Sequence, residues 1–76
     1  MKSKIFDKIF HFLKNEDWME RVYLANNCCF MEHKDRNVVL YMPFRIGESD
    51  SDTIAFISLL AKIYDITEAT LLKRIG

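Results

Sequence analysis

Residues 28–44 read CCFMEHKDRNVVLYMPF, and their pattern is that of a β-hairpin. The second half, NVVLYMPF at 37–44, is rich in the β-branched and aromatic side chains that strands favour. The polar run HKDR at 33–36 predicts the connection between two strands. Pro43 has no N–H to give to a ladder and therefore marks a strand end or an edge position. We expect strands at 28–33 and 37–44.

The segment before the hairpin, WMERVYLA at 18–25, fits two structures. Trp18 and Val22 have the i, i+4 spacing of a helix, whereas RVYL at 21–24 has the composition of a strand. A sheet of only two strands is hard to stabilise, which favours a third strand at about 20–25. The pair Asn26-Asn27 then predicts the turn into the hairpin.

A first helix is predicted at about 4–15. Its apolar residues recur at the i, i+4 and i+8 positions that form one face of an amphipathic helix. Ser3 stands immediately before this pattern and is the expected N-cap. The apolar face consists of Ile5, Phe6, Ile9, Phe10, Phe12 and Leu13.

Two further helices are predicted after the hairpin, at about 52–64 and 67–75. Nine of the twelve residues in TIAFISLLAKIY, 53–64, are apolar, which is typical of a helix that is covered on more than one side. Thr67 is the expected N-cap of the last helix. The order α-(β)-β-β-α-α predicts a small single α+β domain over residues 1–76, in which helices cover one face of an antiparallel sheet of two or three strands.

The chain has more apolar residues than a body of its size can bury. Half of its 76 residues are hydrophobic and 13% are aromatic, yet a chain this short buries only about 60% of its unfolded surface on folding. A second copy is the simplest cover, so we expect a homodimer. Its interface is expected either at strand edges that pair into a continuous sheet or on the apolar helix, at Phe56, Leu59, Leu60 and Ile63.

The charges balance, with 11 basic and 11 acidic residues. Phosphate contacts supply much of the affinity of nucleic-acid binders, so a net charge of zero gives that function no support. The alternative function is still nucleic-acid binding, by a dimer that aligns Lys4, Lys8 and Lys14 of two first helices into one basic surface. A gel shift across a salt series tests it.

We expect a cytoplasmic protein without a membrane span. No run approaches the roughly 18 apolar residues that a span needs, and Asp7, Lys8 and His11 interrupt the segment where a signal peptide needs an apolar core. Two cysteines without an export signal suit a reducing compartment.

The densest group of reactive residue types is Cys28, Cys29 and His33. Adjacent strand residues point to opposite faces, so the two sulfurs separate and too few ligands share a face to hold a metal. A metal or small-ligand sensor built on these residues therefore stays an alternative to small buried thiols. No glycine-rich phosphate loop and no convergent catalytic group is evident, so we expect neither cofactor nor enzyme activity.

The profile that remains is that of a non-catalytic protein-interaction module which binds a protein partner stoichiometrically. Small inhibitors, immunity proteins, antitoxins and phage- or plasmid-borne accessory factors share it. Trp18 is either an exposed hot spot for that partner or a lid on the core. Asp50 and Asp52 either present negative charge to the partner or, as most such residues do, stabilise the start of a helix.

Overall fold

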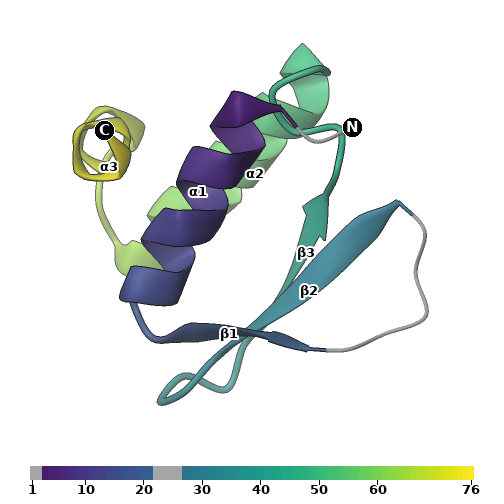
Figure 1. The fold of residues 1–76 in the computed structure, drawn as a ribbon. Coiled ribbons are helices and arrows are strands. Elements are labelled where there is room, and N and C mark those ends of the chain that lie inside the picture. Colours follow the sequence, from purple (N-terminus) through teal and green to yellow (C-terminus); the bar gives the residue numbers. More distant parts are fainter. Residues whose placement is uncertain (1–2, 22–26) are drawn as a thin grey trace.

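The structure is a computed structural model that describes residues 3–21 and 27–76. Its elements follow the order α-β-β-β-α-α, which confirms the predicted α+β class (Figure 1). The elements are α1 at Lys4–Asn15, β1 at Trp18–Arg21, β2 at Cys28–His33, β3 at Val39–Pro43, α2 at Asp50–Tyr64 and α3 at Glu68–Ile75.

The sheet is antiparallel and has the strand order β1-β2-β3. Met31 of the central strand pairs with Glu20 on one side and with Leu40 on the other. β1 begins at Trp18, earlier than the predicted 20, while the predicted positions 22–25 lie outside the described residues. β3 is shorter than the predicted 37–44 and ends at Pro43.

Helices cover one face of the sheet, as predicted. Side chains alternate across a strand, so every second residue of β2 and β3 points to the helices. Met31, Leu40 and Met42 on that face are at most 1% exposed. On the opposite face Val39 is 46% and Tyr41 is 50% exposed. The sheet therefore keeps an open face around Val39 and Tyr41, while Cys28 on the same face is buried.

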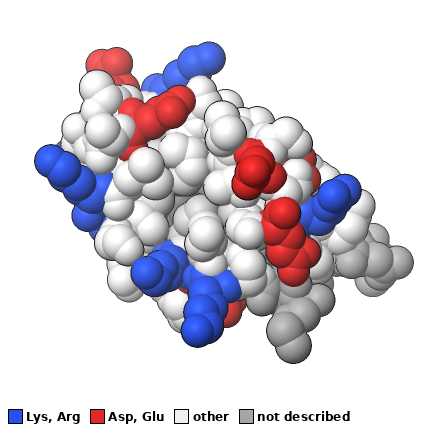
Figure 2. All heavy atoms as spheres, turned by 90° about the horizontal axis from the view of Figure 1, so that it is seen from above, with Lys and Arg blue, Asp and Glu red and all other residues white. Residues whose placement is uncertain are grey.

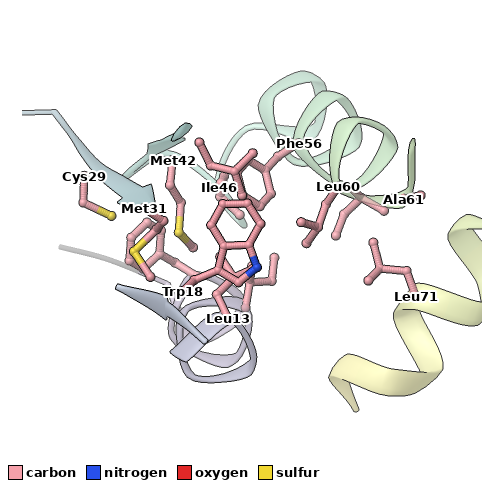
Figure 3. Packing of buried hydrophobic residues seen from close by; sticks show 14 residues of the cluster. Leu13, Trp18, Cys29, Met31, Met42, Ile46, Phe56, Leu60, Ala61 and Leu71 are labelled. Carbon is pink, nitrogen blue, oxygen red and sulfur yellow. The ribbon is translucent and has the colours of Figure 1, made fainter. Parts of the chain in front are cut away.

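A single hydrophobic cluster draws side chains from all six elements (Figure 3). α2 lies between the sheet and α3: Figure 3 shows Phe56 near the strand residues and Leu60 and Ala61 toward Leu71 of α3. Contacts on two sides explain why the sequence of this helix is so apolar. The cluster consists of Phe6, Ile9, Leu13, Trp18, Cys29, Met31, Leu40, Met42, Ile46, Phe56, Ile57, Leu60, Ala61 and Leu71.

Ser3 joins the start of α1 to the loop before α2. Its hydroxyl accepts a hydrogen bond from Phe6 N at 3.0 Å, as an N-cap does, and donates one to Ile46 O at 2.7 Å. Gly47 follows with φ 89°, and a Cβ at this position would collide with the Ser3 side chain. Ser49 caps α2, so that helix begins at Asp50 and not at 52. These contacts fix the orientation of α2 relative to β3.

Candidate interaction surface

β3 is an edge strand whose outer side no other strand of the described chain pairs with. Two backbone hydrogen bonds show which residues of this strand face β2. Phe44 N donates to Asn27 O at 2.9 Å, and His33 N donates to Val38 O at 3.5 Å. In an antiparallel pair the hydrogen-bonded positions alternate. The backbone N–H and C=O groups that point toward β2 are therefore those of the even-numbered residues, 38, 40, 42 and 44.

The odd-numbered residues of β3 consequently direct their backbone groups outward. Val39 and Tyr41 each present an N–H and a C=O on the free edge, whereas Pro43 has no N–H and its C=O accepts a hydrogen bond from Ile46 N at 3.2 Å. The side chains of Val39 and Tyr41 are about half exposed on the open face. A strand edge with unpaired N–H and C=O groups is a template for a further strand.

A groove of about 210 Å³ runs beside this edge, between β3 and α2. The α2 residues recur at i, i+3, i+4 and i+7, which places them on one face of the helix. Phe56, only 3% exposed, forms the floor, and Leu59, 46% exposed, forms a wall. The groove is apolar apart from one carboxylate. Its lining consists of Tyr41, Pro43, Asp52, Ala55, Phe56 and Leu59.

The groove brings Asp52, predicted to bind a partner, together with Phe56 and Leu59 of the predicted dimer interface. Asp50 is exposed but does not line it. Tyr41, Pro43 and Ala55 were not assigned to any site from the sequence. The preference of Pro43 for a strand end or an edge position was the signal in the sequence that pointed to this side of the sheet.

Part of the predicted dimer interface lies inside the monomer. Phe56 is 3% and Leu60 is 0% exposed, because α2 packs these side chains against the sheet, α1 and α3. Ile63 is half-buried against the same cluster. Leu59 remains the predicted interface residue with a largely exposed side chain. Of the four predicted interface residues, Leu59 is therefore the one whose side chain could reach a second copy.

Trp18 belongs to the core, which corrects its interpretation as an exposed hot spot. Its side chain is 1% exposed, and its indole N–H donates to the hydroxyl of Tyr64 at 2.8 Å. The His33 ring packs edge-on against it, with ring centroids 5.1 Å apart. In Figure 3 the indole lies among the labelled core side chains. Trp18 is thus the core lid that was the other interpretation.

Cys28, Cys29 and His33 do not assemble into a site. The two cysteines occupy neighbouring positions on β2, and both are buried and outside any disulfide; Cys29 joins the main cluster. The Nδ1 atom of His33 accepts hydrogen bonds from the N–H groups of Asp35 at 3.0 Å and Arg36 at 3.1 Å. His33 therefore stabilises the β2–β3 turn. Within residues 3–21 and 27–76, no group of three or more His, Cys, Asp or Glu side chains is placed to hold a metal ion.

The lysines of the first helix, Lys4, Lys8 and Lys14, are all exposed. Lys14 places its ammonium 5.6 Å from the Phe10 ring centroid, and Lys8 Nζ lies 3.3 Å from Gly76 O. Figure 2 shows basic and acidic side chains interspersed on the face seen from above, and neither sign dominates it. The face seen in Figure 2 therefore offers a phosphate backbone no continuous basic surface.

Over the ranges that the structure describes, no helix has the length and apolar character needed to cross a bilayer. No protein family, curated protein or solved structure matches this chain. The β3 edge and the groove beside it are therefore interpreted from their own geometry.

Proposed function

We propose that the chain is a non-catalytic protein-interaction module that forms a homodimer by antiparallel pairing of β3 with the β3 of a second copy. The observation that carries the proposal is the free β3 edge, with the N–H groups of Val39 and Tyr41 directed outward beside an apolar groove. Recognition by strand addition uses these two elements: main-chain hydrogen bonds supply affinity, and pockets for alternate side chains supply specificity.

The groove lies where alternate side chains of an added strand would point. On the helix side of the sheet they would pack against Leu59 and Ala55 of α2. On the open face they would lie beside Tyr41, whose side chain is 50% exposed. Pro43 has no N–H to donate, so it limits the pairing to the part of the strand that precedes it.

Several features favour a second copy as the occupant of this edge. Antiparallel pairing of two identical strands is self-complementary about a two-fold axis, the commonest symmetry of homo-oligomers. Monomeric proteins commonly protect an edge with lysine or another charge, but the exposed positions 39 and 41 hold valine and tyrosine. The formal net charge of zero adds no overall repulsion between copies.

Pairing through β3 would join the open faces of two sheets into one surface. Each copy contributes the exposed side chains of Met19, Val39 and Tyr41 to it. Exposed apolar side chains beside the Arg21–Glu32 ion pair on this face suit stoichiometric binding of a protein partner, as in small inhibitors, immunity proteins, antitoxins and accessory factors. We therefore place the protein partner of the dimer on this joined face.

Size-exclusion chromatography with light scattering tests the homodimer. At micromolar concentration we expect about twice the chain mass of 9.0 kDa. The double variant Val39→Lys/Tyr41→Lys should elute as a monomer with an unchanged circular dichroism spectrum, because charges on the edge oppose pairing and both side chains are exposed.

The matched control is Met19→Lys, on the same open face but on β1, where the side chain is 56% exposed. This variant should remain a dimer. A wild-type mass of 9.0 kDa at every concentration tested would overturn the proposal. So would dissociation of the Met19→Lys variant to the same extent as the β3 variant.

A further inference from the structure

A second hollow, of about 370 Å³, opens among the three helices and shares no lining residue with the β3 groove. Its lining positions, 5, 8 and 9 on α1, 53 and 57 on α2, and 72 and 75 on α3, have the three- and four-residue spacings of single helix faces. The residues that line this helical cleft are Ile5, Lys8, Ile9, Thr53, Ile57, Leu72, Ile75 and Gly76.

The helical cleft has an apolar floor and apolar lips. Ile9 and Ile57 at its floor are 1% and 6% exposed. Ile5 and Leu72 at its lips are 48% and 53% exposed, so two large aliphatic side chains face water at its mouth. A ligand that covers these side chains would remove apolar surface from water at both lips.

Lys8 is the charged member of the cleft lining as the structure describes it. Its Nζ atom donates to Gly76 O at 3.3 Å, and an ammonium group has three hydrogens to donate. Thr53 is otherwise engaged: its hydroxyl donates to Ser49 O at 2.7 Å and accepts from Gly47 N at 2.7 Å. Lys8 is therefore the group available to bind a polar head, and it selects a negative one.

We propose that the helical cleft binds a medium-chain fatty carboxylate, with the alkyl chain between Ile5 and Leu72 and the carboxylate at Lys8. The charge of Lys8 beside an apolar wall matches a ligand with an anionic head and an aliphatic tail. Small-molecule sites occupy about 300–1,000 Å³, and this cleft lies at the lower end of that range. Its size fits one short alkyl chain and excludes a two-chain phospholipid.

Isothermal titration calorimetry of the full chain tests the assignment, with octanoate, decanoate, dodecanoate and decanol below their aggregation concentrations. Affinity should rise about fourfold for each methylene group until the cleft is full. Decanoate should bind up to about fivefold more tightly than decanol, which lacks the charge, since Lys8 is exposed and its ion pair is screened.

Two variants and one control locate the ligand. Lys8→Gln should lower the affinity for decanoate to that for decanol and leave the affinity for decanol unchanged. Leu72→Glu, which puts a carboxylate on an exposed lip, should abolish decanoate binding while the fold is kept. Lys4→Gln alters an exposed lysine of the same helix outside the cleft and should change neither affinity.

Three results would overturn the assignment. The first is the absence of saturable binding for any chain length. The second is a Lys8→Gln variant with a lower Tm and an unchanged ratio of decanoate to decanol affinity, which would show that Lys8 only satisfies the Gly76 carbonyl. The third is binding to anionic phospholipid vesicles without binding to monomeric carboxylates. None of these results depends on whether the chain dimerises through β3.

Discussion

Replacing Trp18 by alanine should lower the free energy of unfolding more than any surface substitution. The indole is 1% exposed and packs within the main cluster. Truncating a buried tryptophan to alanine costs about 3–5 kcal/mol, because transfer energy is lost and a cavity remains. A domain of 76 residues has a total stability of about 4–11 kcal/mol. The substitution therefore removes from about a quarter to all of the free energy of unfolding.

The hydrogen bond from the indole to Tyr64 allows a finer test. Tyr64→Phe removes the acceptor 2.8 Å from Nε1 and leaves a buried N–H unpaired, which costs about 1–3 kcal/mol. Trp18→Phe removes the donor and part of the ring. In a double-mutant cycle we expect the two substitutions to couple by about 0.5–1.5 kcal/mol.

Urea unfolding followed by far-UV circular dichroism measures these changes, with all variants at one protein concentration so that any dimerisation contributes equally. Fluorescence gives an independent check, since Trp18 is the sole tryptophan. Its native emission should be blue-shifted and protected from acrylamide. A loss below about 1 kcal/mol for Trp18→Ala, or ready quenching in the native state, would refute the placement of Trp18 in the core.

Three smaller predictions concern the contact between Ser3 and the loop before α2, and the open face of the sheet. The same urea assay measures them. Gly47→Ala should lower the free energy of unfolding by about 1–3 kcal/mol, because φ is 89° and the Ser3 side chain occupies the Cβ position. Gly76 also has a positive φ but has open space around it, so Gly76→Ala should lower the free energy of unfolding by less. Ser3→Ala should cost about 1–2 kcal/mol through loss of the N-cap, and no loss would contradict this role. Arg21→Ala should cost below about 1 kcal/mol, with little effect at high salt, because its ion pair with Glu32 is exposed.

Local patterns in the sequence were sufficient to predict the helices and strands and several of the residues at which they begin or end. The strand composition around Tyr41 and the apolar spacing of residues 5–13 each depend on neighbours within a few positions. Ser3 and Thr67 were identifiable as N-caps for the same reason, and both side chains accept the capping bond. The open face was not predictable in this way, because residues 38–42 are all apolar and no period-two pattern separates the exposed Val39 and Tyr41 from the buried Leu40 and Met42.

Contacts between distant segments explain what the sequence left open. The burial of Trp18 depends on the docking of Tyr64, 46 residues away, and no local pattern at 18–25 determines it. In α2 nearly every side is apolar, so periodicity did not separate the buried Leu60 from the exposed Leu59. The groove and the cleft likewise result from how α2 lies against β3, α1 and α3, which is a tertiary property.

Backbone hydrogen exchange at Val39 and Tyr41 tests the central claim, pairing through the β3 edge, most directly. NMR-detected exchange should show both amides protected at high protein concentration, to a degree approaching that of Leu40, whose N–H the β2–β3 ladder holds. That protection should fall on dilution, while Leu40 stays protected. Exchange of Val39 and Tyr41 at unprotected rates at every concentration, beside a protected Leu40, would contradict the claim.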